Sequence, residues 1–333
     1  MKNILINVKV DEEKLEELRK MPEVNVEVIE DFKTKSRYIS PQILRNKHIL
    51  FCNLPPENFN DLDSLELIQI STSGYNQLFN LGLVEKGIRV CNAQGVSSIS
   101  IAEWNIAMMI NLAKDLRGMI RNQEAGIWDR SARFQKEIRG SIVGIWGYGA
   151  IGRETARLAK AFGMKVYVMG RKIPSIETNV YRVEGTGDPE GILPDKVFLS
   201  GQEEEFLKNL DFLVISMPLT NNTEGLIGER ELKMLPKTAY ILNPARGPII
   251  QEEALIKALK EGWIAGAALD THYYYPMPPD HPLWSFPNVI MTPHISGSPH
   301  SERIWDIFLQ NVKRFLTGQP LLNELTPRQL KGE

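Results

Sequence analysis

The sequence predicts an α/β protein with two Rossmann-like, doubly wound parallel-sheet domains. Its 333 residues are too many for one core and suit two. Short apolar runs alternate with helical patterns along the chain, an order typical of parallel sheets covered by helices. One of these runs ends in the glycine-rich turn GYGAIG, residues 147–152, which opens a further helical pattern.

Two αβ series follow one another. The first has the helical pattern EEKLEELRK and apolar runs at 4–8, 24–30, 48–52 and 65–72. A long helix is expected over 98–118, because apolar residues recur there with a 3.6-residue period, and Ser98 or Ser100 could cap it. The second series has apolar runs at 141–147, 165–170, 211–216, 239–243, 264–270 and 288–292. Six such strands fit two mononucleotide-binding halves.

A last helical pattern, residues 299–311, follows the second series and has room to return to the first domain. The expected architecture is therefore a discontinuous domain of residues 1–98 and 299–333 with a second domain, 99–298, inserted in it. Residues 173–200 are rich in Gly and Pro and are the least periodic part, which indicates a surface loop.

Composition narrows the class of protein. With 43% hydrophobic residues, 24% charged residues and a net charge of -2, nothing favours a nucleic-acid partner. Cys52 and Cys91 are too few for a disulfide framework and are interpreted as buried thiols. We predict no metal site and no membrane span, and the N-terminus lacks a signal-peptide core, so a cytoplasmic protein is expected.

The GYGAIG turn predicts a dinucleotide site. Gly147, Gly149 and Gly152 would allow a tight turn, close approach of a pyrophosphate, and packing of helix on strand. The N-terminus of the helix would supply N–H groups and a favourable dipole for the phosphates. A glycine turn that binds no ligand is the alternative.

The end of the next apolar run bears on the choice of cofactor. An NAD-specific turn usually has an acid there, which binds the ribose 2′-hydroxyl. This chain has Gly170, Arg171 and Lys172 instead. Two cations suit a 2′-phosphate, so NADP(H) is favoured over NAD(H), and a solvated basic turn is the alternative.

Downstream motifs complete a family pattern. They are STSGYNQL at 71–78, ISIAEW at 99–104, MPLTNNTEGLIG at 217–228, NPARG at 243–247, AALD at 267–270 and TPHISG at 292–297. Together with GYGAIG and in this order, they resemble the D-isomer-specific 2-hydroxyacid dehydrogenase family over nearly the whole chain. That family includes glyoxylate and hydroxypyruvate reductases, phosphoglycerate dehydrogenases and formate dehydrogenases.

The resemblance implies roles for four substrate-site residues. Arg246 would hold the carboxylate and carbonyl of a small 2-oxo or 2-hydroxy acid, a task that suits a planar, permanently charged fork. His294 would be the acid/base that gives a proton to the carbonyl oxygen or takes it back. The backbone of Ser73 and Gly74 would bind the carboxylate, although Asn76 stands where the family usually has an aspartate.

The resemblance also implies a set of cofactor-binding residues. Asp270 would face the nicotinamide amide, with a turn cap as the alternative interpretation. The set comprises Gly147, Gly149, Ala150, Ile151, Gly152, Arg171, Lys172, Pro218, Thr223 and Asp270.

One departure from the family stands in THYYYP, residues 271–276. Most members have a catalytic glutamate 29 residues after the arginine of NPARG, and here that position is Tyr275. The proline that normally follows the glutamate is present as Pro276, so the register holds and His294 lacks its usual carboxylate partner. Tyr275 could orient the imidazole through its hydroxyl or simply pack against the pocket, and Asp280 or a water could replace the missing acid.

Three functions remain open from the sequence. The leading one is an NAD(P)-dependent oxidoreductase of a glyoxylate- or hydroxypyruvate-like acid, acting as a homodimer paired through the helix over 98–118. A dinucleotide-sensing binding protein of the same fold is the second, favoured by loss of the glutamate. A formate dehydrogenase-like enzyme is the third, since those relatives also lack the acid, but they have an asparagine where Ser97 stands here.

Overall fold

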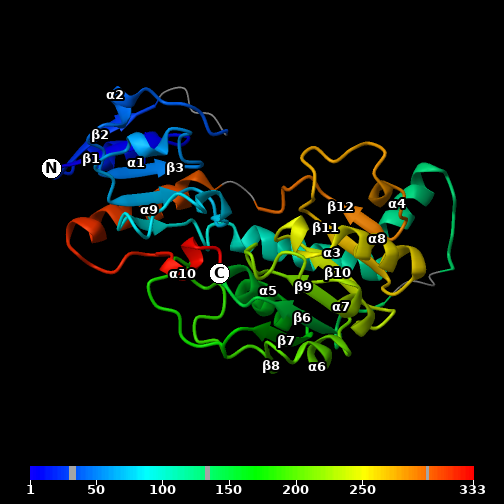
Figure 1. The fold of residues 1–333 in the computed structure, drawn as a ribbon. Coiled ribbons are helices and arrows are strands. Elements are labelled where there is room, and N and C mark those ends of the chain that lie inside the picture. Colours follow the sequence, from blue (N-terminus) through cyan, green and yellow to red (C-terminus); the bar gives the residue numbers. More distant parts are fainter. Residues whose placement is uncertain (30–34, 132–135, 298–299) are drawn as a thin grey trace. The chain divides into compact units, whose positions relative to one another are not determined.

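A computed structural model describes residues 1–29, 35–131, 136–297 and 300–333 of the chain. The chain divides into two compact units (Figure 1). Unit 1 comprises Met1–Val96, Thr178–Val183 and Pro299–Glu333, and unit 2 comprises Ser97–Glu177 and Glu184–Ser298. The expected bounds at 98/99 and 298/299 lie within two residues of these divisions, but the placement of 178–183 in unit 1 was not expected.

Unit 1 is built on a parallel sheet with the strand order β2-β1-β3-β4-β5. The strands are β1 Lys2–Asn7, β2 Val24–Val28, β3 Ile49–Cys52, β4 Leu67–Ile70 and β5 Arg89–Cys91. The helices are α1 Glu12–Arg19, α2 Pro41–Leu44, α9 Ser301–Leu316 and α10 Pro327–Leu330. Strands β3 and β4 are buried along their whole length because helices or loops cover both faces, which explains their continuous apolar sequence. The buried thiols expected at Cys52 and Cys91 are found.

Helix α9 packs its apolar side on this sheet. Phe51 of β3 stacks on Phe308, with ring centroids 4.2 Å apart, and meets the edge of Trp305. The indole nitrogen of Trp305 donates to Lys9 O, which satisfies its one polar group. The helix continues to Leu316, five residues beyond its predicted end at 311, while Pro299, where it was predicted to begin, lies outside the described residues.

Unit 2 is built on a second parallel sheet with the order β12-β11-β10-β9-β6-β7-β8. The strands are β6 Ile142–Trp146, β7 Lys165–Gly170, β8 Lys196–Leu199, β9 Phe212–Ile215, β10 Tyr240–Asn243, β11 Gly266–Leu269 and β12 Val289–Met291. The helices are α3 Ser98–Lys114, α4 Leu116–Glu124, α5 Ala150–Ala161, α6 Glu203–Leu207, α7 Glu229–Met234 and α8 Glu252–Glu261. This is the doubly wound arrangement whose two halves diverge at β6, where dinucleotides bind. The predicted fold class is confirmed.

The long helix predicted over 98–118 is interrupted. Helix α3 ends at Lys114, and Asp115 takes a left-handed conformation, φ 48°, before α4 begins. The Asp115 carboxylate accepts from the N–H of Gly118 and so caps α4. The prediction that Ser98 or Ser100 caps α3 was wrong, because Ser97 occupies the cap position.

The segment predicted as a surface loop, 173–200, is anchored in both units and ends in β8. In unit 2, the buried guanidinium of Arg153 donates to Ser175 O and Asp188 O, and it pairs with Glu177 at 3.2 Å. In unit 1, the N–H of Tyr181 donates to the Asn323 side chain at 3.0 Å. These ties fix a segment whose sequence has no regular period.

Candidate active site

The turn between β6 and α5 has the geometry that its glycines predict. Gly147 has a left-handed φ of 99°, and a Cβ atom there would lie 2.8 Å from Met217 N. A Cβ atom on Gly152 would lie 2.4 Å from Gly147 O. Gly149 precedes Ala150 and Ile151, the first residues of α5. The helix begins at the switch point of the sheet with its N–H groups directed outward, so these residues fit a pyrophosphate.

Tyr148, within this turn, ties it to the segment that follows β7. Its hydroxyl donates to Asp188 Oδ2 at 2.7 Å. Asp188 is buried and also accepts from three successive backbone N–H groups, of residues 191, 192 and 193. This link could not be predicted from the sequence, because an isolated Asp in a Gly- and Pro-rich stretch is usually solvated.

Arg171 and Lys172 stand at the carboxyl end of β7, the strand next to β6. Both side chains are exposed. Within the described residues, neither makes a hydrogen bond or an ion pair with the protein. Two cations at the position of the ribose-binding acid are therefore available to an anion from outside.

Pro218 and Thr223 lie in the turn that follows β9. The Thr223 hydroxyl donates to Pro218 O at 2.7 Å and accepts from the N–H of Thr220. These bonds give the turn a fixed shape beside the strand that neighbours β6.

The residues of the substrate site follow three neighbouring strands. Arg246 comes three residues after β10, Asp270 directly after β11, and His294 three residues after β12. Because β10, β11 and β12 are parallel neighbours, their carboxyl ends meet at one edge of the sheet. This topology brings together residues that lie 24 positions apart in the sequence.

Asp270 organises the loop that carries His294. Its side chain is completely buried, and Oδ1 accepts from the Thr292 hydroxyl at 2.6 Å and from the Ile295 N–H at 2.9 Å. Oδ2 accepts from both the N–H and the hydroxyl of Ser296. Four hydrogen bonds thus stabilise the carboxylate and fix the loop.

His294 is held at the tip of that loop with a left-handed φ of 58°. A non-glycine residue in this region is uncommon and depends on the surrounding bonds to stay there. Burial lowers the pKa of His294 below its ordinary value, and the nearby Arg246 cation lowers it further, while Asp270 opposes the change. The ring therefore gives up its proton more easily than a solvated imidazole does.

Arg246 precedes the short turn η3, Gly247–Ile249. The Asn243 side chain accepts from the Ala245 N–H and donates to Arg246 O, which fixes the backbone. The Arg246 guanidinium donates from Nη1 to Ala245 O at 2.7 Å and, within the described residues, makes no other hydrogen bond. Burial lowers the pKa of Arg246, and Tyr275 raises it by less. Most donors of the fork remain free for an anion.

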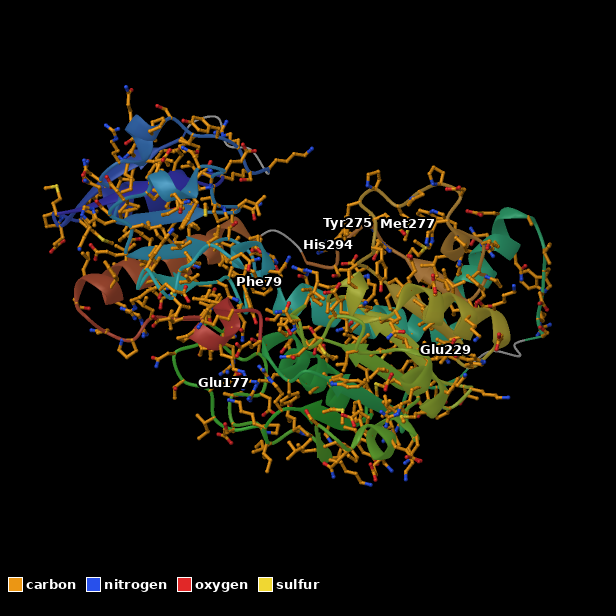
Figure 2. All side chains as sticks on the ribbon, in the orientation of Figure 1. Phe79, Glu177, Glu229, Tyr275, Met277 and His294 are labelled. Carbon is orange, nitrogen blue, oxygen red and sulfur yellow. The ribbon has the colours of Figure 1, made fainter. Side chains whose placement is uncertain are left out.

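Tyr275 lies beside His294, with ring centroids 5.6 Å apart (Figure 2). Its side chain is 59% exposed, and its hydroxyl accepts from the backbone N–H of His272 at 3.2 Å. The ring thus contacts the histidine while the hydroxyl is engaged elsewhere. Asp280 is exposed and, in the described part of the chain, makes no ion pair, so the structure gives no support for it as a replacement acid.

The other two tyrosines of the run fasten their segment to the turn after Arg246. The hydroxyl of Tyr273 donates to Ile250 O, and that of Tyr274 donates to Glu252 at 3.4 Å. Burial raises the pKa of Tyr273 to about 12, so this donor keeps its proton. Glu252 also pairs with His281 at 3.0 Å. These contacts could not be predicted from the sequence, because nothing in a tyrosine run indicates which partner each ring has.

Ser73 and Gly74 belong to unit 1 and follow β4. Their carbonyl oxygens accept from the side chains of Asn92 and Thr72, at 2.7 and 2.8 Å. Within the described residues, the N–H groups of Ser73 and Gly74 donate to no protein acceptor. The loop is thereby fixed with two donors free.

The described residues contain neither a group of metal ligands nor a membrane-spanning helix. Among the described residues, no three His, Cys, Asp or Glu side chains are grouped as metal ligands. None of the helices in those parts of the chain is both long and apolar enough to cross a membrane.

A doubly wound parallel sheet with a glycine turn at its switch point defines a dinucleotide-binding α/β protein, and comparison with known proteins shows its family. Residues 106–296 match the family model for the NAD binding domain of D-isomer specific 2-hydroxyacid dehydrogenases. A glyoxylate reductase of Thermofilum pendens is 31% identical over 83% of this chain and 80% of its own. A hydroxypyruvate reductase of Blautia hydrogenotrophica is 29% identical over 80% of this chain and 81% of its own.

Solved structures agree in fold. A D-isomer specific 2-hydroxyacid dehydrogenase of Xanthobacter autotrophicus, solved with NADPH and MES, has a TM-score of 0.79 at 24% identity and covers 98% of this chain and 99% of its own. An NADPH-dependent glyoxylate/hydroxypyruvate reductase of Sinorhizobium meliloti has a TM-score of 0.78 at 22% identity, with complete coverage of both chains. The chain belongs to the D-isomer specific 2-hydroxyacid dehydrogenase family, so the predicted oxidoreductase class and nicotinamide cofactor are confirmed.

Proposed function

We propose that this protein reduces a small 2-oxo acid, of the glyoxylate or hydroxypyruvate kind, to the 2-hydroxy acid with NADPH. The observation that carries the proposal is the placing of Arg246 and His294 at one sheet edge, with a guanidinium whose donors are largely free beside an acid/base of lowered pKa. A dinucleotide sensor would need neither residue. When bound, the reduced nicotinamide supplies a hydride to C2 of the substrate.

Arg246 binds the substrate carboxylate and carbonyl in this mechanism. The guanidinium stays charged at neutral pH despite its burial, and a planar fork matches a carboxylate with two parallel hydrogen bonds. Ser73 and Gly74 of unit 1, which the family resemblance assigns to the carboxylate, have N–H groups that donate to no protein acceptor within the described residues. Positioning by the Arg246 guanidinium would orient the carbonyl carbon for attack.

His294 protonates the carbonyl oxygen as the hydride arrives. The imidazolium loses one proton to the oxygen and becomes neutral, so one proton and one hydride are consumed for each 2-oxo acid reduced. Oxidation of the 2-hydroxy acid requires the neutral ring and returns the proton. Asp270 serves the loop rather than the ring, since the hydrogen bonds that its carboxylate accepts within the described residues come from residues 292, 295 and 296.

The absence of a carboxylate partner predicts a particular pH dependence. Reduction needs protonated His294, so its rate falls as pH rises through the pKa of that ring, and the lowered pKa places this fall at lower pH. Tyr275→Glu is expected to raise the pKa and move the fall to higher pH, because a carboxylate stabilises imidazolium. The isosteric neutral variant Tyr275→Gln is the control. An identical profile for the Glu and Gln variants would show that position 275 does not act on His294.

We further propose that Arg171 and Lys172 select NADPH over NADH. A charge-assisted bond to phosphate contributes about 1.5 to 3 kcal/mol, which corresponds to about 10- to 150-fold in kcat/KM. Arg171→Ala should lower the NADPH-to-NADH preference by that factor. Lys165→Ala, at the opposite end of the same strand, is the control and should leave the ratio unchanged. Equal use of both cofactors by the wild type would contradict the proposal.

The chain is also proposed to form a homodimer through α3 and the residues after it. Large apolar side chains are exposed on α4 and beyond, namely Met119 at 39%, Ile120 at 54%, Ile127 at 57% and Trp128 at 88%. On α3 itself, Ile101, Ile106 and Met109 are buried, and the exposed residues of this helix are Glu103 and Ala107. Four large apolar side chains exposed within ten residues of the sequence favour a protein partner.

Light scattering tests the dimer. At micromolar concentration the wild type should have twice the mass of the chain, and Trp128→Asp should shift it toward the monomer. Tyr38→Asp, at a tyrosine 63% exposed on unit 1, is the control that should remain dimeric. A monomeric wild type would refute the proposal.

Steady-state oxidation of NADPH with a panel of 2-oxo acids tests the proposed function. We expect sustained turnover with glyoxylate or hydroxypyruvate and little with bulky 2-oxo acids. Tight NADPH binding without turnover of any acid would instead favour the dinucleotide sensor. Turnover of formate with NADP⁺ would favour a formate dehydrogenase-like enzyme.

A further inference from the structure

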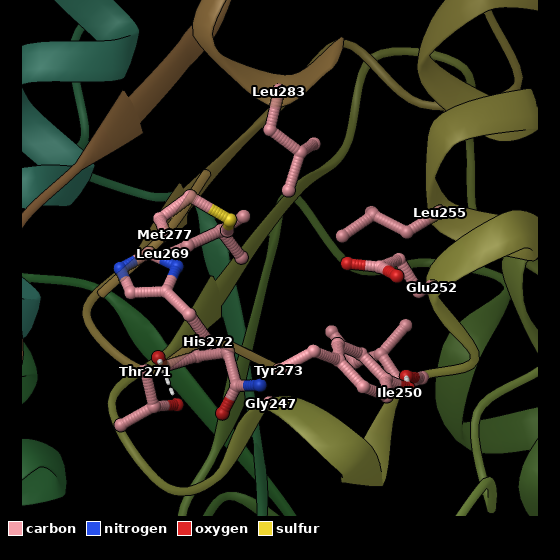
Figure 3. A pocket seen from close by; sticks show the side chains of 11 residues that line it. Gly247, Ile250, Glu252, Leu255, Leu269, Thr271, His272, Tyr273, Met277 and Leu283 are labelled. Atoms are coloured by element: carbon pink, nitrogen blue, oxygen red, sulfur yellow. Dashed lines mark hydrogen bonds between the residues drawn. The ribbon is translucent and has the colours of Figure 1, made fainter. Parts of the chain in front are cut away.

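We propose that His272, which follows Asp270 by two positions, is a positioning residue that holds the catalytic loop of His294. This inference deepens the proposed function and rests on it for its kinetic consequences. His272 lies just after β11, is 8% exposed, and lines a small cavity together with Glu252, Met277 and Leu283 (Figure 3). Its ring and its backbone N–H both have protein partners, so it is not one of the groups left free for a substrate.

The ring of His272 is joined directly to the loop. Its Nε2 lies 2.8 Å from Thr292 O, and because a carbonyl oxygen can only accept, Nε2 carries the proton. Thr292 O also accepts from the N–H of His294 at 3.0 Å. One carbonyl oxygen therefore accepts hydrogen bonds from both the His272 ring and the backbone N–H of His294.

The backbone of His272 holds the other ring of the site. Its N–H donates to the Tyr275 hydroxyl at 3.2 Å, and Tyr275 lies against His294. His272 is thus joined by its ring to the loop that carries His294 and by its backbone to the tyrosine whose ring lies beside His294. The left-handed φ of 58° at His294 needs such support from neighbouring residues.

The remaining ring nitrogen shows what this arrangement costs. Nδ1 of His272 is buried and, within the described residues, has no hydrogen-bond partner. The adjoining cavity of about 20 Å³ has room for one water molecule. Glu252 lines the same cavity: its Oε2 accepts from the Tyr274 hydroxyl, while its buried Oε1 lies 3.0 Å from His281 Nε2 and, within the described residues, accepts no hydrogen bond. A buried imidazole is retained here although one of its nitrogens has no partner, which indicates that the role of the residue is the hydrogen bond from Nε2.

Kinetics of three variants separate a positioning role from simple packing. Glutamine places an N–H donor where Nε2 lies, whereas leucine fills the space without one. His272→Leu should lower kcat for 2-oxo acid reduction about 10- to 100-fold, with the KM for NADPH unchanged, because a misplaced acid/base costs rate rather than cofactor affinity. His272→Gln should keep most of kcat. His281→Leu, which removes another imidazole beside the same segment, is the control and should behave as wild type.

Nuclear magnetic resonance of ¹⁵N-histidine-labelled protein tests the same contact without turnover. We expect a slowly exchanging Nε2–H signal from His272 in the wild type, and ring signals of His294 that move in His272→Leu but stay in His272→Gln and His281→Leu. Unmoved His294 signals in the Leu variant, or equal kcat in the Leu and Gln variants, would overturn the proposal. A wild type without any turnover would refute the proposed function, while the His294 signals would still decide the role of His272.

Discussion

Replacing His294 with asparagine is expected to lower kcat for reduction about 10²- to 10⁴-fold, the usual contribution of a positioned general acid. Asparagine can still donate a hydrogen bond to the carbonyl oxygen but cannot deliver a proton, and it tolerates the left-handed backbone that position 294 requires. The loss should therefore come from chemistry rather than from a collapsed loop.

The measurement is steady-state kcat together with the dissociation constant of NADPH from fluorescence titration. NADPH affinity should stay at the wild-type value, because the glycine turn that fits the pyrophosphate lies between β6 and α5. His281→Asn is the control for loss of an imidazole. A variant at position 294 with more than half of the wild-type kcat would exclude His294 as the acid.

Replacing Arg246 is expected to have a comparable effect on kcat/KM. Two charge-assisted hydrogen bonds of about 1.5 to 3 kcal/mol each would be lost in Arg246→Met, so kcat/KM for the 2-oxo acid should fall about 10²- to 10⁴-fold. Arg246→Lys should recover only part of this, because an ammonium group keeps the charge but not the planar fork.

Added guanidinium ion offers a sharper test of the same residue. In Arg246→Ala, the removed side chain leaves space, and millimolar guanidinium should restore part of the activity while methylammonium restores less. The KM for NADPH should not change in any of these variants. Equal recovery by the two cations, or a loss confined to the KM for NADPH, would contradict the assignment of Arg246 to the substrate.

The sequence predicted most strands of the fold, and the exceptions have physical reasons. Strands such as β3, β4 and β9 are buried on both faces, so their whole length is apolar and easily recognised. Strand β5 spans only Arg89–Cys91, too short for any period to appear. The break between α3 and α4 falls at Asp115, and neither Gly nor Pro stands at this position or next to it in AKDLR to indicate it.

Part of the candidate site could be predicted because its motifs follow parallel strands. Motifs after parallel strands converge because the carboxyl ends of the strands do, so the nearness of Arg246, Asp270 and His294 follows from the topology. The roles of His272 and Asp188 could not be predicted, because each depends on a hydrogen bond to a residue far away in the sequence. His272 bonds to Thr292, 20 positions later, and Asp188 bonds to Tyr148, 40 positions earlier. Spacing in the sequence contains no trace of such contacts.

We propose that this chain transfers a hydride from a nicotinamide to C2 of a 2-oxo acid while His294 supplies the proton. Reduction of glyoxylate and hydroxypyruvate with NADPH in which both hydrogens at C4 are replaced by deuterium, followed by mass spectrometry and NMR of the product, tests it most directly. We predict one deuterium at C2 of the 2-hydroxy acid for each NADPH consumed, with the hydroxyl hydrogen from solvent, and hydroxypyruvate giving the D isomer. NADPH consumed without deuterium at C2, or bound NADPH left unconsumed with every acid, would contradict it.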